Sequence, residues 1–215
     1  MACQDELFER KSETLALGPG AAVLAGFAHP IAPQLLDAIA AVARVSPFRH
    51  MVTPRGSRMS AAMTNCGQVG WLTDLTGYRY DARDPETSEP WPAIPPLFLD
   101  LATRAASHAG FANFVPDACL VNRYTPGARL SLHQDRDERD YGQPIVSVSL
   151  GLPATFLFGG LKRTDRPRRI GLRHGDVVVW GGPSRLTFHG VDSLDDGEHP
   201  ATGRLRYNLT FRRAL

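Results

Sequence analysis

The sequence predicts a mainly β protein of the α+β class, in which an antiparallel jelly roll (a double-stranded β-helix) follows N-terminal helices and a lid. Three observations predict this: two helix-like segments, an aperiodic segment between them, and eight short strand-like runs in the C-terminal half. With 43% hydrophobic and 21% charged residues, the chain can bury a core, so global disorder is excluded.

The N-terminal part, residues 1–46, is expected to form an extension and a helix. Residues 31–45 place Leu35, Leu36, Ile39 and Val42 at helical spacing. Residues 97–109 repeat the pattern behind Pro95 and Pro96, which predicts a second amphipathic helix at the start of the core, residues 93–215.

Residues 47–92 show no sustained periodicity and interleave turn-forming residues with large side chains. A long aromatic-bearing segment of this kind indicates a lid or binding surface. The alternative is an irregular cover whose aromatic rings fill the core. The large side chains are Met51, Met59, Met63, Trp71, Tyr78, Tyr80 and Trp91.

The eight runs are rich in Val, Leu, Phe and Tyr and are separated by Gly, Pro, Asp or Asn. With no helix between them, they predict an antiparallel sandwich or barrel, best matched by a jelly roll whose mouth can hold a ligand. The runs are ACLVNRYT, ARLSLHQD, IVSVSLG, ATFLFGG, RRIGLR, DVVVWGG, SRLTFHG and RLRYNLTFR.

Strand alternation is the most informative feature. In residues 204–212 the odd positions are apolar, whereas the even positions Arg206, Asn208 and Arg212 fall on the opposite face. The same parity sets Arg185, Thr187 and His189 against Leu186 and Phe188. Asn122 with Tyr124, and His133 with Asp135, likewise share a strand face, because each pair is two residues apart. If all these polar faces line the interior, the jelly roll contains a site. The alternative is that they face solvent.

Two His and one carboxylate on one side of a metal form the facial triad of non-haem iron(II) oxygenases. His133 and Asp135 supply two ligands from one strand end, and His189 would complete the set. A His-x-Asp pair alone carries little information, because short motifs arise by chance. Arg206 and Arg212 add specificity, since inward-facing arginines require an anion, such as a dicarboxylate cosubstrate.

Composition excludes other classes. No window holds 18 uncharged apolar residues, and residues 1–20 lack an apolar signal core, so neither a membrane span nor a secretory signal is expected. Cys3, Cys66 and Cys119 form no Cys-x-x-Cys pair, which favours a reducing cytoplasm. The net charge is only +2, but residues 162–173 are strongly basic. This segment forms either a solvated face or a rim that contacts phosphates.

The combination of HQD at residues 133–135, His189-Gly190 and RYNLTFR at residues 206–212 resembles the HxD…H…RxNxTxR signature of the AlkB-type iron(II)- and 2-oxoglutarate-dependent dioxygenases, which reverse alkylation damage in nucleic acids. The resemblance covers most of the chain from Ser46 onward but not the first thirty residues, and Gln68 stands where a His is expected.

The resemblance implies roles for particular residues. Iron would be held by His133, Asp135 and His189, which are both the metal ligands and the catalytic group. The 2-oxoglutarate would be bound by Asn122, Arg123, Tyr124, Arg206, Asn208 and Arg212. The substrate would meet the nucleotide-recognition lid, residues 47–92, and the pocket rim through Trp71, Tyr78, Arg79, Tyr80, Asp137 and Arg163.

The resemblance also implies the reaction: with Fe(II), 2-oxoglutarate and O2, N1-methyladenine and N3-methylcytosine in single-stranded DNA lose their methyl group as formaldehyde. Double-stranded DNA and RNA are further candidate substrates. Both lesions are cations, so stacking on Trp71 and a carboxylate at Asp137 would favour them. A damaged base also costs less to unstack than an intact one. A monomer without a protein partner or membrane contact is expected.

Two other classes stay open at this point. A dioxygenase of the same fold could act on a protein or a small molecule, and Trp71 and Tyr78 in the lid argue against this. A non-enzymatic jelly-roll binding module would make the His and Asp residues structural, and it would not bind iron together with 2-oxoglutarate.

Overall fold

The computed structural model describes residues 13–215. Residues 1–12 lie outside the described residues. They include Cys3, the first part of the expected N-terminal extension, and the start of residues 1–20, in which no secretory signal is expected. Within residues 13–215, no helix is both long and apolar enough to cross a membrane.

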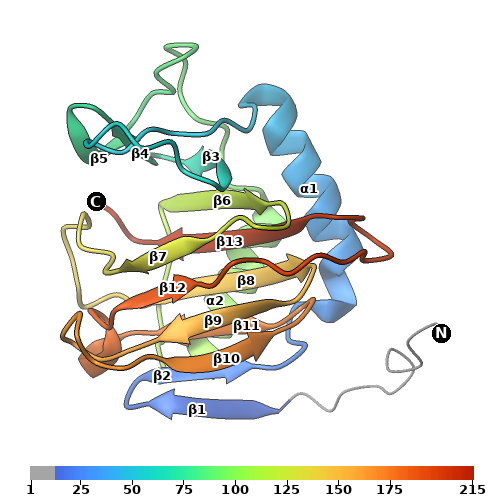
Figure 1. Cartoon of the computed structure of the whole chain (residues 1–215), viewed down its shortest axis with the longest axis vertical. Helices are drawn as coiled ribbons and strands as arrows, with labels where there is room; N and C mark the ends of the chain where they lie inside the picture. The colour runs from blue at the N-terminus through green and yellow to red at the C-terminus, as the bar shows by residue number, and fades with distance from the viewer. Residues whose placement is uncertain (1–12) are drawn as a thin grey trace.

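Two antiparallel sheets face each other (Figure 1). The major sheet has the strand order β1 (Thr14–Gly18), β2 (Ala21–Leu24), β11 (Val177–Trp180), β8 (Ile145–Gly151), β13 (Arg206–Arg212), β6 (Ala118–Tyr124) and β3 (Ala62–Gly67). The minor sheet has the order β10 (Arg168–Leu172), β9 (Ala154–Phe158), β12 (His189–Val191) and β7 (Leu130–His133). A separate hairpin, β4 (Gly70–Asp74) and β5 (Gly77–Asp81), lies at the top of Figure 1. The predicted jelly-roll class is confirmed.

Both helices pack on the outer face of the major sheet. These are α1 (Ala32–Val45) and α2 (Pro96–His108), close to the ranges that their periodicity predicts. Their apolar stripes share one core with the apolar face of β13; for example, the ring of Phe98 meets the edge of Phe211 at 6.0 Å between centroids. The helices therefore cover one face of the major sheet, and its other face is directed toward the minor sheet.

That opposite face is polar and buried, as the alternation predicts. Arg206, Asn208, Thr210 and Arg212 are each at most 6% exposed. Because side chains alternate along a strand, the apolar residues of β13 that pack on α2 force these polar residues into the space between the sheets. The interior beside β13 is thus polar and can hold a site, whereas the interior between β11, β9 and β10 holds an apolar cluster that includes Phe156, Ile170 and Trp180.

Three features differ from the sequence-based expectation. Strands β1 and β2 extend the major sheet beyond β11, although the N-terminal part predicts only a helix. The expected lid, residues 47–92, contains β3, a buried strand paired with β6 along its whole length, so only part of this segment lies outside the core. In the run that was expected to be one strand, β12 begins only at His189, after the short 3-10 helix Gly182–Ser184.

Candidate metal centre and active site

The ends of β7 and β12 bring together two histidines and one aspartate. His133 and His189 are direct register partners across the two strands, with ring centroids 4.4 Å apart. Asp135 follows β7, and its Oδ1 lies 3.5 Å from Nε2 of His133, while its Oδ2 lies 3.8 Å from Nε2 of His189. One potential ligand atom from each of the three residues lies within 4.8 Å of the other two. Among residues 13–215, no other three His, Cys, Asp or Glu residues form such a group.

Nδ1 of each imidazole ring forms a hydrogen bond with the backbone. Nδ1 of His133 lies 2.9 Å from the Ser131 carbonyl oxygen, and Nδ1 of His189 lies 3.0 Å from that of Thr187. A backbone carbonyl can only accept, so both rings carry their proton on Nδ1 and direct the Nε2 lone pair inward. Two neutral imidazoles and a carboxylate on one side, with the other side free, form the donor set that suits Fe(II).

Electrostatics keep these ligands ready for a cation. Burial opposes ionisation of Asp135, but the nearby charge of Arg212 and the two histidines outweigh it and hold the pKa of Asp135 well below its ordinary range. Burial, together with His133, lowers the pKa of His189 to about 3. The carboxylate is therefore charged and His189 is neutral near pH 7, which is the state that a metal ion requires.

Arg206 shows that the interior is built for an anion. It is 1% exposed, its Nη2 donates to Ser149 Oγ at 3.0 Å, and its guanidinium lies 5.1 Å from the Tyr124 ring centroid. Its Nε and Nη1 atoms have no hydrogen-bond partner within the described residues. A buried guanidinium without a carboxylate is costly, so a carboxylate from outside the chain fits here.

The amides of this pocket lie where the sequence analysis expects them, but their bonds differ. Asn122 and Asn208 are register partners, and Asn122 Nδ2 donates to Asn208 Oδ1 at 3.2 Å. Asn208 Nδ2 donates to Ser147 Oγ at 2.7 Å and to the Val148 carbonyl at 3.0 Å. Asn208 therefore positions Asn122, whose buried Oδ1 has no hydrogen-bond partner within residues 13–215.

Arg123 does not belong to this pocket, and its expected contact with 2-oxoglutarate is wrong. It is the register partner of Tyr207, on the outer face of the sheet, and its guanidinium lies over the Phe48 ring at 4.5 Å. The neighbours Asn122 and Tyr124 face inward, and side chains of consecutive strand residues point in opposite directions.

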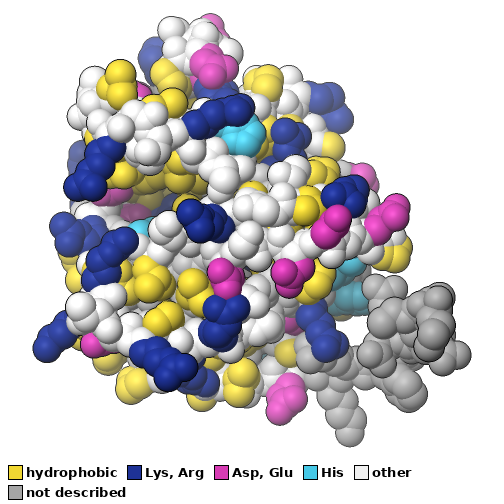
Figure 2. All heavy atoms as spheres, viewed as in Figure 1, with side chains coloured by type: hydrophobic (Ala, Val, Ile, Leu, Met, Phe, Trp, Pro, Cys, Tyr) yellow, Lys and Arg dark blue, Asp and Glu magenta, His cyan; other side chains and the backbone are white. Residues whose placement is uncertain are grey.

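The hairpin presents an aromatic pair beside the triad. The rings of Trp71 and Tyr78 stack at 5.8 Å, and Trp71 Nε1 donates to Asp137 Oδ2 at 2.7 Å. Asp137 comes two residues after Asp135, so this bond places the aromatic pair at the metal centre. Figure 2 shows a hollow below the hairpin, with small patches of His and of Asp or Glu colour at depth and Lys and Arg around it.

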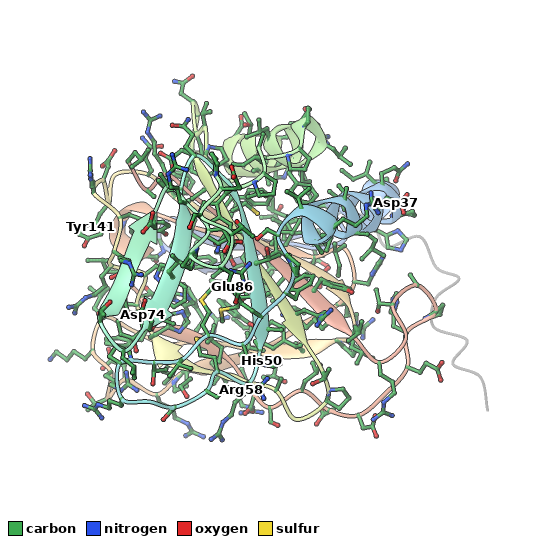
Figure 3. All side chains as sticks on the ribbon, turned by 90° about the horizontal axis from the view of Figure 1, so that it is seen from above. Asp37, His50, Arg58, Asp74, Glu86 and Tyr141 are labelled. Atoms are coloured by element: carbon green, nitrogen blue, oxygen red, sulfur yellow. The ribbon has the colours of Figure 1, made fainter. Side chains whose placement is uncertain are left out.

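The other expected substrate residues have different positions. Arg79 is the register partner of Leu72, on the hairpin face opposite Trp71, and forms an ion pair with Asp74 at 2.8 Å, so its expected substrate contact stays a prediction. Figure 3 shows Asp74 on this hairpin, seen from above. Tyr80 turns its hydroxyl inward to Glu138, at 2.6 Å. Arg163 is exposed, with its guanidinium over the Phe188 ring at 5.9 Å.

Two charged residues of the site are not singled out as site residues by the sequence analysis. Glu138 is buried and accepts from Arg185 Nη2 at 3.0 Å. Arg185 also donates through Nη1 to the Asp135 carbonyl at 2.9 Å. The only signal in the sequence for Glu138 is its place in the acidic run after His133, where every acid looks equally solvated.

A jelly roll that holds two histidines and an aspartate beside a buried, carboxylate-seeking arginine is the arrangement of a non-haem iron(II) oxygenase with a 2-oxo acid cosubstrate. The chain belongs to the 2OG-Fe(II) oxygenase superfamily, whose family model matches residues 20–212. Within it, the chain is an alpha-ketoglutarate-dependent dioxygenase of the AlkB type, which confirms the predicted class and its use of Fe(II) and 2-oxoglutarate.

The relatives fit this membership. The chain is 62% identical over 198 residues to alpha-ketoglutarate-dependent dioxygenase AlkB of Salmonella typhimurium, covering 92% of each chain. It is 44% identical over 110 residues to DNA N(6)-methyladenine demethylase ALKBH1D of Arabidopsis thaliana, covering 45% of this chain and 24% of the relative. The solved structure of OsALKBH1 matches with a TM-score of 0.81 and 31% identity, over 94% of this chain and all of that one.

Proposed function

We propose that this dioxygenase oxidatively removes methyl groups from alkylated bases, N1-methyladenine and N3-methylcytosine, in single-stranded DNA, with double-stranded DNA and RNA as further candidate substrates. The observation that carries the proposal is the aromatic pair Trp71–Tyr78, which is bonded to Asp137 next to the iron ligands. A flat, partly exposed indole beside a carboxylate suits a flat cation. The name of the Arabidopsis relative, a DNA demethylase, supports the substrate class.

In this proposal, His133, Asp135 and His189 hold Fe(II), and the inner pocket holds 2-oxoglutarate. Arg206 and Tyr124 pair with its distal carboxylate, and Arg212 lies at the iron end. Asn208 orients Asn122, which donates the second N–H of its Nδ2 to the cosubstrate. When bound, iron, 2-oxoglutarate and dioxygen supply the oxidation of the N-methyl carbon, with succinate, carbon dioxide and formaldehyde as products. The chain's own residues orient the methyl group and exclude water.

The lid residues select the base. Trp71 offers a stacking face to a cationic ring, and Asp137 adds opposite charge at the exposed edge of the site. A damaged base cannot pair normally, so its extrusion costs less than that of an intact base. Arg163 and the basic segment 162–173 contact the phosphate backbone without reading its sequence.

The proposal extends to organisation. Residues 93–215 together with β3 form the catalytic core, and the β4–β5 hairpin is its substrate lid. The protein acts in the cytoplasm as a monomer and needs no protein partner. A sedimentation experiment on the Fe(II)-loaded protein, with and without oligonucleotide, tests the monomer; a dimer in either sample contradicts it.

The test of the substrate is formaldehyde release from one single-stranded sequence that carries a cationic lesion (N1-methyladenine or N3-methylcytosine) or a neutral one (N1-methylguanine or N3-methylthymine). Asp137→Asn is expected to lower kcat/KM on the cationic lesions by about 1–2 kcal/mol, roughly 5- to 30-fold, and to change the neutral lesions much less. One salt concentration is used throughout, because salt alters phosphate binding.

Asp140→Asn is the matched control, since Asp140 lies in the same acidic run but bonds the backbone of Gly142. Equal losses on cationic and neutral lesions in Asp137→Asn would remove the charge-selection role. Turnover of none of the methylated oligonucleotides by the wild type, while 2-oxoglutarate is consumed with a protein or small-molecule substrate, would overturn the proposed substrate class.

A further inference from the structure

Glu138 is a buried carboxylate that bonds to three different parts of the molecule. It is 6% exposed, and both oxygens are used: Oε2 accepts from Arg185 Nη2 at 3.0 Å, and Oε1 accepts from Tyr80 Oη at 2.6 Å. Arg212 Nε lies 3.4 Å from Oε1. A buried charge is tolerated only when it is paired and hydrogen-bonded, so this arrangement is held as a unit.

Both arginines that meet Glu138 also hold Asp135. Arg212 donates through Nε and Nη2 to Asp135 Oδ2, at 2.9 and 2.7 Å. Arg185 donates to the backbone carbonyl of Asp135, at 2.9 Å, and to that of Gln143, at 3.0 Å. Glu138 therefore fixes the two cations that set the position of Asp135, the aspartate of the metal centre.

The β4–β5 hairpin is attached to the same short segment at two points. Trp71 and Tyr80 are register partners on one face of the hairpin. Trp71 bonds to Asp137, which is exposed, and Tyr80 bonds to Glu138, which is buried. Because Asp137 is exposed and Glu138 is buried, the Trp71 bond can be replaced by a ligand at the surface while the Tyr80 bond keeps the hairpin attached to the interior.

We propose that Glu138 is a positioning residue that couples the substrate hairpin to the cosubstrate pocket, by tying Tyr80 of the hairpin to Arg212 and, through both arginines, to Asp135. This inference rests on the proposed function, because the hairpin ligand is taken to be a methylated oligonucleotide. It assigns Glu138 and Tyr80 a role in communication between two ligands, whereas the sequence analysis places Tyr80 at the substrate.

The coupling follows from shared ordering. Residues 135–138 carry the metal-centre aspartate at one end and both hairpin contacts at the other. A ligand that immobilises this segment from one side lowers the conformational entropy that a second ligand must spend on it. By linkage, 2-oxoglutarate and the oligonucleotide then tighten each other's binding by the same factor.

The test measures this factor in the Fe(II)-loaded protein without oxygen. The affinity of a single-stranded oligonucleotide with one N1-methyladenine is measured by fluorescence anisotropy, with and without 2-oxoglutarate. In the wild type, 2-oxoglutarate is expected to raise the affinity at least about fivefold, the lower end of ordinary coupling. Tyr80→Phe removes only the hydroxyl and is expected to reduce the factor to less than about twofold. Glu138→Gln is expected to do the same.

Tyr207→Phe is the matched control, because it makes the same change on the outer face of β13, where Tyr207 packs near Phe48. If Tyr80 has a purely structural role, Tyr80→Phe lowers the thermal midpoint or weakens the binding of both ligands, but 2-oxoglutarate still raises the oligonucleotide affinity by the wild-type factor. An unchanged factor in Tyr80→Phe therefore overturns the coupling. So does a wild-type factor near one in a protein that binds the oligonucleotide.

A second readout needs no ligand. Backbone amide exchange in β5 is expected to accelerate in Tyr80→Phe but not in Tyr207→Phe, while β6 and β13 stay protected in both. Unchanged β5 exchange means that Tyr80 does not anchor the hairpin and overturns the inference. If the wild type neither binds nor demethylates the oligonucleotide but β5 loosens as expected, the substrate assignment fails and the anchoring role survives.

Discussion

At the scale of single residues, the members of the metal centre differ in what surrounds them. The side chain of His133 is 33% exposed, whereas that of Asp135 is 8% exposed and forms an ion pair with Arg212. In the sequence, both are simply ligands that one strand end supplies to the same predicted metal site. The structure separates them, because only Asp135 balances a buried cation.

His133→Ala is therefore expected to abolish Fe(II) binding with little loss of stability. Asp135→Ala is expected to abolish it and also to destabilise the fold, by up to about 3 kcal/mol, because the buried Arg212 then keeps only its longer contact with Glu138, at 3.4 Å. Anaerobic titration with Fe(II) and 2-oxoglutarate, followed by the visible charge-transfer band, measures binding, and urea unfolding measures stability. Equal stability of the two variants would contradict this and show that the existing contact with Glu138 is enough to balance Arg212.

Replacing Arg206 is expected to raise the stability of the ligand-free protein and to lower its affinity for 2-oxoglutarate. Burial lowers the pKa of its guanidinium, and two of its nitrogens have no partner within the described residues. Arg206→Met removes this uncompensated charge at similar volume, so the ligand-free protein is expected to gain stability, by roughly 1–4 kcal/mol, while 2-oxoglutarate affinity falls about 100-fold or more. Calorimetry measures both quantities. A variant that is less stable without ligand would mean that Arg206 is satisfied by the fold itself.

At the scale of elements, strand alternation explains both the successes and the errors of the sequence analysis. It correctly turns Arg206, Asn208 and Arg212 inward along β13. The same rule places Arg123 on the outer face of the sheet, away from the pocket in which the family resemblance puts it. A residue next to a site residue in a strand faces away from the site, whatever its chemistry.

The spacing of β7 and β12 is set by Gly190, directly after His189. A Cβ at this position would lie 2.6 Å from the Leu130 carbonyl oxygen, so the two strands could not keep their distance. Gly190→Ala is expected to move His189 relative to His133 and to weaken Fe(II) binding at least about tenfold, the scale on which displaced ligand supports act. Gly171→Ala, in β10 of the same sheet, has open space around its Cβ and is the matched control. Unchanged iron affinity in Gly190→Ala would show that the sheet absorbs the methyl group.

At the scale of the whole molecule, three histidines join segments that are distant in the sequence. His174, before β11, stacks on His199 at 4.5 Å and meets the edge of His29 at 5.6 Å. Its Nδ1 accepts from the backbone N–H of Gly151 at 2.9 Å. This cluster lies away from the metal centre and ties the start of α1 to the loop before β13.

Burial, with the neighbouring rings of His199 and His29, lowers the pKa of His174 from about 6.5 to about 4. Below about pH 6.5 the unfolded chain binds a proton that the folded chain refuses until about pH 4, so this residue makes the protein less stable as the pH falls through that window. His174→Asn is expected to flatten the decline. Urea midpoints from about pH 7 to about pH 4 test this, with His50→Asn, an exposed histidine, as control. Parallel curves for all three proteins would contradict it.

Local periodicity and residue type were enough to predict both helices, the eight strand runs, the inward polar face and the candidate triad of His133, Asp135 and His189. Each can be read over a few residues, because side-chain direction repeats with the period of the strand or helix. The AlkB-type resemblance then supplied the chemistry that local patterns leave open.

Which polar groups meet depends on how distant segments pack, and the sequence alone did not predict it. Pairing of β12 with β7 brings His189 to His133, and the hairpin brings Tyr80 to Glu138, a residue that looks like any solvated acid in the sequence. Strand pairing also placed β1, β2 and β3 in the major sheet. Contacts of this kind join distant segments, and their free energy comes from burial and charge pairing in the assembled core, which no local pattern records.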